Sequence, residues 1–226
     1  MHTRLLCLST LALLTGLGLS DAPAWAMAAK SQSTPQQADR QPGAPLPLVE
    51  EEAGHVIHLG ARLTFETSKG NFTFVTFPRE APKTVEQIVR LVRAGFYDGL
   101  AVHRIVRGTA VQMGDPGTRN KPAAHPEIGR GGSGKTIAPE FVGQTVRYLP
   151  GTVGLARGKS PTSGDSQFFV TLDSAPHLEE SYAIFGQVTS GMDVVRELTI
   201  GDRIHKARVS QEDPGYQAPP APSVSP

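Results

Sequence analysis

Two short runs in which apolar and polar residues alternate open the globular part of the sequence, within residues 62–77 (RLTFETSKGNFTFVTF). Leu63 and Phe65 mark one face of the first run, and Phe72 and Phe74 mark one face of the second. A polar Ser-Lys-Gly-Asn segment separates the two runs. Because alternation with a period of two is typical of half-buried strands, the pattern predicts a β-hairpin.

The period of the apolar residues then changes within residues 81–95 (APKTVEQIVRLVRAG). Apolar side chains recur there at i, i+3, i+4 and i+7, which predicts an amphipathic helix. Pro82 suits the first helical turn and Gly95 suits the end of the helix. The recurring apolar residues are Val85, Ile88, Val89 and Val92.

Four later stretches are short, rich in β-forming residues and separated by Gly, Pro and Ser: GTVGLAR, SQFFVTL, AIFGQV and KARVS. A fifth stretch, GMDVVRELTIG, is predicted to be a second helix. Many short strands with only two helices do not make an alternating βαβ fold. The pattern therefore favours a mainly β domain, an antiparallel barrel or sandwich.

Residues 1–28 have the layout of a secretory signal peptide: an early Arg4, an apolar run over residues 5–19, and small residues around Ala26 and Ala28. The alternative is a membrane anchor, but the run of 15 residues is shorter than the ~20 that a membrane helix needs. We predict cleavage, a periplasmic or secreted mature chain, and no integral membrane segment in it. Cys7, the sole cysteine, would leave with the signal.

The composition of residues 29–226 indicates a linker, a folded domain and a tail. Residues 29–55 are rich in Gln, Pro, Ala and Ser and are predicted to be a linker, and residues 211–226 are predicted to be a Pro-rich disordered tail. The folded domain is expected over residues 56–210.

Lys and Arg number 22 against 21 Asp and Glu, so no strong electrostatic field is available to recruit nucleic acid. His55 and His58 lack a nearby third ligand, and no metal or cofactor is expected.

Residues 129–136 (GRGGSGKT) satisfy the phosphate-binding pattern G-x-x-x-x-G-K-[ST]. That motif needs a buried strand before it and a helix after it. Here the preceding letters are NKPAAHPE, and no apolar helical face follows. We therefore interpret the segment as a glycine-rich surface loop that enters a strand at Thr136 and Ile137.

Five blocks, in order, resemble the cyclophilin-type peptidyl-prolyl isomerases: FYDGLAVHRI, VQMGDP, GTVGLAR, SQFFVTL and AIFGQV. The resemblance extends over about residues 62–209. It implies a closed eight-stranded antiparallel barrel with a helix over each open end. It also implies peptidyl-prolyl cis-trans isomerase activity on proline-containing polypeptide clients, carried out by a monomer without a cofactor.

The resemblance assigns roles to individual residues. Arg104 matches the catalytic arginine, and Gln112, beyond a tight Arg107-Gly108 turn, matches the glutamine that orients it. On the residues alone, Arg104 is equally a surface cation, and Phe169 and Leu178 are ordinary core. The implied substrate contacts are Gln167 and the backbone of Ala156 and Arg157 for the peptide, Phe169 as the floor of the proline pocket, Leu178 as a wall, and Tyr182.

Three positions depart from the family pattern. Thr109 and Ala110 stand where the family usually carries Phe and Met, which close the proline pocket, and His177 stands where many eukaryotic members carry a Trp that binds cyclosporin. We expect weak or no cyclosporin binding. Residues 116–130 form a longer loop that is expected to shape the groove. A working isomerase with a shallow pocket is favoured, and a peptide-binding or chaperone module with little turnover is the alternative.

Overall fold

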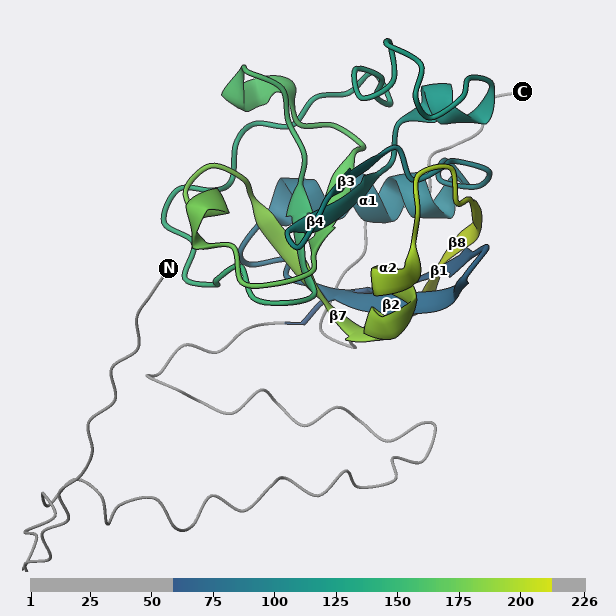
Figure 1. Cartoon of the computed structure of the whole chain (residues 1–226). Coiled ribbons are helices and arrows are strands. Elements are labelled where there is room, and N and C mark those ends of the chain that lie inside the picture. Colours follow the sequence, from purple (N-terminus) through teal and green to yellow (C-terminus); the bar gives the residue numbers. More distant parts are fainter. Residues whose placement is uncertain (1–58, 213–226) are drawn as a thin grey trace, which may run out of the picture. The chain divides into compact units, whose positions relative to one another are not determined.

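The computed structural model describes residues 59–212, and this part contains eight strands and two α-helices (Figure 1). The predicted signal peptide, the whole of the predicted linker, His55 and His58, and the tail from residue 213 lie outside the described residues. No helix in the described part is long and apolar enough to cross a membrane. The elements are β1 (Arg62–Thr67), β2 (Gly70–Thr76), α1 (Pro82–Arg93), β3 (Arg104–Val106), β4 (Ala110–Met113), β5 (Thr152–Leu155), β6 (Phe168–Thr171), β7 (Ile184–Ser190), α2 (Met192–Glu197) and β8 (Ile204–Gln211), with short 3-10 turns at Pro116–Arg119, Pro161–Ser163 and Pro176–Leu178.

The predicted hairpin is formed by β1 and β2. Phe65 pairs with Phe72 and Leu63 pairs with Phe74, so all four side chains lie on one face. Pairing continues to Thr67 and Gly70, which makes the connection shorter than the four turn residues that the sequence indicated. The hairpin prediction is confirmed.

The predicted helix is α1, which begins at Pro82 and ends at Arg93. Its four predicted apolar positions, Val85, Ile88, Val89 and Val92, are all buried. Gly95 follows with a φ of 65°, a left-handed conformation that glycine adopts without strain. The helix contacts β8 and covers the interior of the curved sheet from one side (Figure 1).

All strands join one antiparallel sheet in the order β3-β4-β6-β5-β7-β2-β1-β8. The predicted closed barrel is confirmed only in part, because β3 and β8 do not pair along their length. The segment before β3 reaches the start of β8 through an isolated bridge, Ala101 to Arg203, and through a hydrogen bond from Val102 N to Asp202 O of 2.8 Å. β3 has only three residues, too few to continue the ladder. The sheet is therefore curved and open.

The concave face of the sheet holds the main core, which is aromatic at its centre. Phe65 stacks on Phe72 with ring centroids 5.2 Å apart, and Phe168 meets Phe65 edge to face at 5.3 Å. Side chains alternate along a strand, so Phe168 and Val170 of β6 enter this core, and Phe169 between them faces the other side. A second, smaller apolar cluster forms around Phe169 on that outer face.

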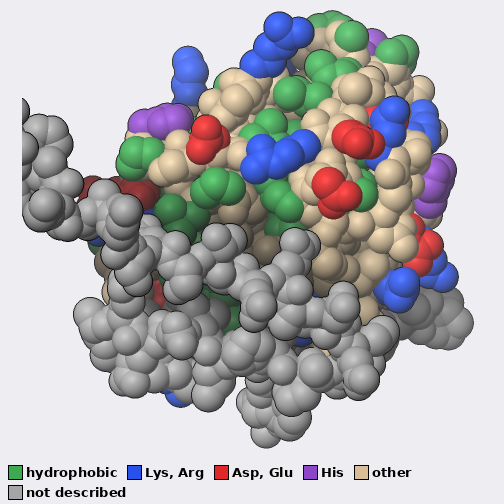
Figure 2. Space-filling view, turned by 60° about the horizontal axis from the view of Figure 1, so that its bottom comes forward, with side chains coloured by type: hydrophobic (Ala, Val, Ile, Leu, Met, Phe, Trp, Pro, Cys, Tyr) green, Lys and Arg blue, Asp and Glu red, His purple; other side chains and the backbone are tan. Residues whose placement is uncertain are grey.

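Charge is distributed without a dominant sign on the surface that Figure 2 shows. Basic and acidic side chains lie interspersed there among apolar and neutral ones. This distribution agrees with the near-equal numbers of basic and acidic residues in the sequence, and this face carries no broad patch of one charge.

Candidate active site

A row of directly paired residues crosses four strands on the outer face of the sheet. Arg104 of β3 pairs with Gln112 of β4, Gln112 pairs with Phe169 of β6, and Phe169 pairs with Gly154 of β5. Residues that oppose each other across antiparallel strands point to the same face. The sheet register therefore brings a cation, an amide and an aromatic ring side by side, although 65 positions separate Arg104 from Phe169.

The ring of Phe169 is held from three sides. It stacks on Tyr148 at a centroid distance of 5.7 Å and meets Tyr182 edge to face at 5.5 Å. Beneath it, Gly154 leaves the space that the ring fills, because a Cβ there would lie 2.4 Å from Phe169 Cζ. The only exposed part of Phe169, 6% of its surface, borders the cavity described next.

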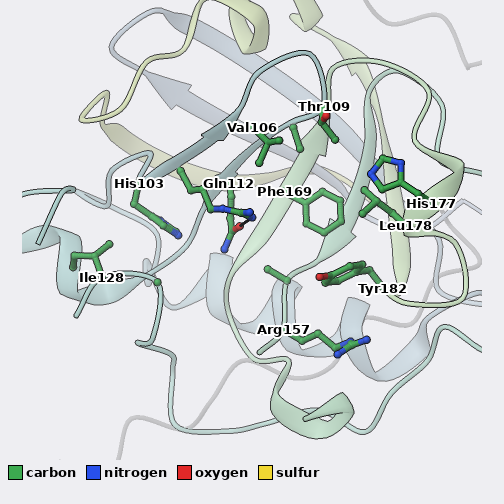
Figure 3. Close-up of a pocket in the computed structure, with 14 residues that line it drawn as sticks. His103, Val106, Thr109, Gln112, Ile128, Arg157, Phe169, His177, Leu178 and Tyr182 are labelled. Carbon is green, nitrogen blue, oxygen red and sulfur yellow. Dashed lines mark hydrogen bonds between the residues drawn. The ribbon is translucent and has the colours of Figure 1, made fainter. Parts of the chain in front are cut away.

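A cavity of about 440 Å³ opens above this ring, which is within the size range of small-molecule and peptide-side-chain pockets. Its wall brings together ten of the eleven residues that the sequence analysis assigned to the site (Figure 3). They are Arg104, Thr109, Ala110, Gln112, Ala156, Arg157, Phe169, His177, Leu178 and Tyr182. Gln167 is the exception, since it lines an adjoining hollow on the other side of Gln112.

Hydrogen bonds connect Arg104 to the interior. Arg104 Nη1 donates to Gln112 Oε1 at 3.2 Å, and Gln112 Nε2 donates to Gln167 Oε1 at 2.9 Å. Gln167 Nε2 in turn donates to the carbonyl of Gly131 at 2.8 Å. The guanidinium remains exposed, so its orientation depends on this series of amides.

The glycine-rich loop that contains Gly131 binds carboxylates of the protein itself. The N–H groups of Gly129 and Gly131 donate to Asp115, and the N–H of Gly134 donates to Asp165. No helix follows, because the next element after the loop is an isolated bridge at Ile137. The interpretation of residues 129–136 as a loop is confirmed, but the strand predicted at Thr136 and Ile137 is reduced to that single bridge.

A family model described as "Cyclophilin type peptidyl-prolyl cis-trans isomerase/CLD" matches residues 62–214, more than half of the chain. The chain belongs to the cyclophilin family. A probable peptidyl-prolyl cis-trans isomerase of Brucella abortus is 40% identical over 139 residues, which are 60% of this chain and 70% of that protein. Peptidyl-prolyl cis-trans isomerase B of Bacillus subtilis is 36% identical over 137 residues, 60% of this chain and 88% of that protein.

Solved structures of cyclophilins are similar to the structure of this chain. A cyclophilin from Hirschia baltica is similar with a TM-score of 0.56 and 25% identity, over 66% of this chain and 73% of that one. A cyclophilin-type isomerase from Cryptosporidium parvum has a TM-score of 0.59 and 23% identity, over 68% of this chain and 99% of that one. At 23% identity, the similarity to the Cryptosporidium parvum protein supports the fold alone.

The side chain of Arg157 has a place in this cyclophilin that the sequence analysis did not foresee, since only its backbone was assigned. Arg157 Nε donates to Ser181 O at 2.7 Å. Its guanidinium lies 5.1 Å from the ring centroid of Tyr182 and 5.4 Å from that of Phe141. A cation over an aromatic face is attracted to it, so Arg157 supports Tyr182 from behind, on the side away from Phe169 (Figure 3).

The structure adds four residues to the cavity wall: His103, Val106, Ile128 and Gly129. Val106 lies two positions after Arg104 on β3, so strand alternation alone places it on the same face. Ile128 and Gly129 come from the long loop over residues 116–130, which the sequence analysis expected to shape the groove. Nothing in their local pattern indicated which loop residues would reach it.

His103 is the most unusual of these four. Only 8% of its surface is exposed, and neither ring nitrogen makes a hydrogen bond of ordinary geometry within the described part of the chain. Burial lowers the pKa of His103 below its usual 6.5, and the negative charge of Asp115 opposes that shift only in part. The imidazole is therefore neutral at neutral pH and adds no second cation beside Arg104.

Proposed function

We propose that this cyclophilin accelerates rotation about Xaa-Pro bonds of polypeptide clients, with Arg104 as the catalytic residue and without covalent chemistry. The observation that carries the proposal is the paired row of Arg104, Gln112 and Phe169 beside one cavity, in a chain of the cyclophilin family. No nucleophile or cofactor is needed for this reaction, since only a torsion changes.

The barrier to this rotation is electronic. The C–N bond of an amide has partial double-bond character, so rotation costs ~18–20 kcal/mol and takes tens to hundreds of seconds without a catalyst. Rotation removes the nitrogen lone pair from conjugation, and a donor directed at that nitrogen favours the rotated form. Arg104 supplies a permanently charged, planar donor. Because its position is fixed in advance by Gln112, it acts mainly on the transition state.

The cavity fits the proline ring of a client. Phe169 provides its floor, and Leu178 and Tyr182 lie along one side (Figure 3). The small side chains of Thr109 and Ala110 also line the cavity. A proline bound here would contact less apolar surface than with large residues at both positions, a loss on the order of 1–3 kcal/mol of binding. We expect a pocket that is shallow and tolerant of substituted rings.

The client backbone is assigned to the surface between Gln112 of β4 and the two residues that follow β5. These two residues are Ala156 and Arg157, and both border the cavity and the adjoining hollow. The amide of Gln112 already accepts from Arg104 and donates to Gln167. Each amide group has further lone pairs and N–H bonds, so Gln112 can hold Arg104 and contact the client together.

The same small residues, Thr109 and Ala110, favour a second candidate, a peptide-binding module with little turnover. The two functions differ in what they require of Arg104. The test measures cis/trans exchange of an Ala-Xaa-Pro-Phe peptide by NMR, with the wild-type chain, Arg104→Ala, and Arg107→Ala as the matched control. Arg107 is an exposed arginine in the turn between β3 and β4 and is outside the cavity wall.

Catalysis predicts fast exchange that Arg104→Ala abolishes and Arg107→Ala leaves in place. Peptide binding without accelerated exchange in the wild-type chain would overturn the isomerase proposal and establish the binding module. Exchange that survives Arg104→Ala would show that another residue carries the reaction.

We also propose that the clients are exported proteins and that the mature domain acts in the periplasm or outside the cell. The support is the signal-peptide layout of residues 1–28. Terminal sequencing of the protein recovered from fractionated cells tests it. A mature terminus near residue 27 or 29 in the periplasmic or medium fraction is expected, and an intact Met1 in the cytosol would contradict it.

A further inference from the structure

We propose that Asp115 is a positioning residue for the isomerase site, acting on Arg104 through the loop at residues 129–131 and two glutamine amides. The proposal rests on the proposed function, because it concerns the same arginine. It adds a residue that lies outside the cavity wall and to which the sequence analysis assigned no role, although the block VQMGDP contains it.

The first step is the anchoring of the loop. Asp115 has 1% of its surface exposed, which makes an unpaired carboxylate there very costly. Its Oδ2 accepts from Gly129 N at 2.6 Å and from Gly131 N at 3.0 Å, and its Oδ1 accepts from Gly117 N at 2.8 Å. Two of these three backbone donors belong to residues 129–131, so the buried carboxylate fixes the path of that segment.

The second step is the carbonyl of Gly131. With its N–H held by Asp115, Gly131 directs its carbonyl oxygen to Gln167 Nε2 at 2.8 Å. The acceptor obliges Gln167 to present its NH2 group to the loop, so its Oε1 must face the other way. This oxygen accepts from Gln112 Nε2 at 2.9 Å.

The third step sets the acceptor for the arginine. Because Gln112 uses its NH2 group toward Gln167, it presents Oε1 to Arg104 Nη1 at 3.2 Å. If Gln112 were rotated by half a turn, its NH2 group would face the guanidinium. If Gln167 were rotated, its NH2 group would face the NH2 group of Gln112, so in either case two donors would oppose each other. The orientation of both amides therefore depends on the one carbonyl that Asp115 holds in place.

A second buried carboxylate, which lies before β6 and binds the same loop, provides the control. Asp165, with 9% of its surface exposed, accepts from Gly134 N at 2.9 Å and from the hydroxyl of Ser133. It anchors the far end of the loop but holds no group whose carbonyl meets a glutamine of the site. Asp165→Asn thus removes the same charge and weakens contacts to the same loop, but it removes no hydrogen bond to Gly131.

The loop also offers a matched pair of glycines. A Cβ at Gly131 would lie 2.4 Å from Asp115 Oδ1, and a Cβ at Gly132 would lie 2.4 Å from Asp165 Oδ2. Gly131→Ala and Gly132→Ala therefore add the same methyl group to the same loop and displace a carboxylate equally. Only the first of the two disturbs Asp115, so the pair keeps the test available if Asp115→Asn folds poorly.

The experiment compares Asp115→Asn with Asp165→Asn, and Gly131→Ala with Gly132→Ala, in the full chain. For each variant, the thermal midpoint, the dissociation constant of an Ala-Xaa-Pro-Phe peptide, the exchange rate of the bound peptide and the side-chain amide resonances of Gln112 and Gln167 are measured. Asp115→Asn and Gly131→Ala are expected to slow exchange about tenfold or more relative to their controls, with peptide affinity within about twofold. Both glutamine amide resonances should shift.

A purely structural role for Asp115 is separated by a double-mutant cycle. In a Gln167→Ala background the connection is already broken, so Asp115→Asn should change exchange less than about twofold. Equal losses in Asp115→Asn and Asp165→Asn, additive effects in the cycle, or unmoved glutamine resonances would each overturn the proposal. If the wild-type chain does not accelerate exchange, the proposed function fails, and the glutamine resonances alone then decide whether Asp115 orients the amides.

Discussion

Gly154 lies directly opposite Phe169 across β5 and β6, and a Cβ at Gly154 would lie 2.4 Å from both Phe169 Cζ and Tyr148 Oη. Neither ring can yield easily, since Phe169 is 6% and Tyr148 is 1% exposed. The floor of the cavity thus depends on the absence of a side chain on the neighbouring strand.

Gly154→Ala is expected to destabilise the domain by about 1–3 kcal/mol, the usual cost of overpacking, and to weaken peptide binding because Phe169 tilts into the cavity. Denaturant unfolding and peptide titration measure both effects. Gly158→Ala is the control, because the nearest atom to a Cβ at Gly158 is Ser163 Oγ at 3.3 Å, and no aromatic ring lies within 4 Å. Equal effects in the two variants would show that the space beneath Phe169 is not limiting.

Arg157 should affect binding more than turnover. Removing its guanidinium in Arg157→Ala leaves Tyr182 without the cation 5.1 Å from its ring centroid, and we expect peptide affinity to fall about threefold to tenfold. Exchange of the bound peptide should stay near the wild-type rate, in contrast to Arg104→Ala. Arg157→Lys should recover little, because an ammonium group lacks the planar face and the Nε donor. Slower exchange at unchanged affinity would contradict this role.

Larger side chains at Thr109 and Ala110 should deepen the pocket. Thr109→Phe with Ala110→Met adds apolar surface to the cavity wall, and the affinity for a proline peptide is expected to rise about fivefold to tenfold. Cyclic analogues with bulky ring substituents should lose affinity in the same variant. Peptide titration with proline and with the substituted analogue measures both. A weaker proline complex would mean that the small residues already match the client.

His103 should make the domain less stable on acidification. Its pKa is lowered in the folded state, mainly by burial, so the unfolded chain takes up the proton first as the pH falls. The resulting stability is fully present above pH ~6.5 and declines as the pH falls through the folded-state pKa. In His103→Asn, unfolding free energy should depend less on pH between ~7 and ~5. An unchanged pH dependence in this variant would contradict the assignment.

Much of the domain follows from local patterns in the sequence. The alternation around Phe65 and Phe72 predicts the hairpin, and the spacing from Val85 to Val92 predicts α1. Arg104 and Gln112 lie eight residues apart around a tight turn, which brings them face to face once β3 and β4 pair. These relationships depend only on neighbours along the chain.

The remainder depends on contacts between distant segments. The two edges of the sheet come together only at the bridge between Ala101 and Arg203, and no local sequence pattern predicts that contact. Gln167 and Gly131 are joined by a hydrogen bond across 36 positions, so the resemblance pointed to the glutamine but not to its partner. The side chain of Arg157 was missed for the same reason, since Phe141 and Tyr182 reach it from separate loops.

The glycine-rich loop has one more consequence. Its backbone donors converge on carboxylates that belong to the same chain, Asp115 and Asp165. A tethered anion has an effective concentration of millimolar or more at its partner, and it holds its place whatever the solution contains. Phosphate or nucleotide in solution therefore finds these backbone N–H groups already hydrogen-bonded. The loop satisfies an anion-binding sequence pattern, but its backbone donors are already occupied by carboxylates of the same chain.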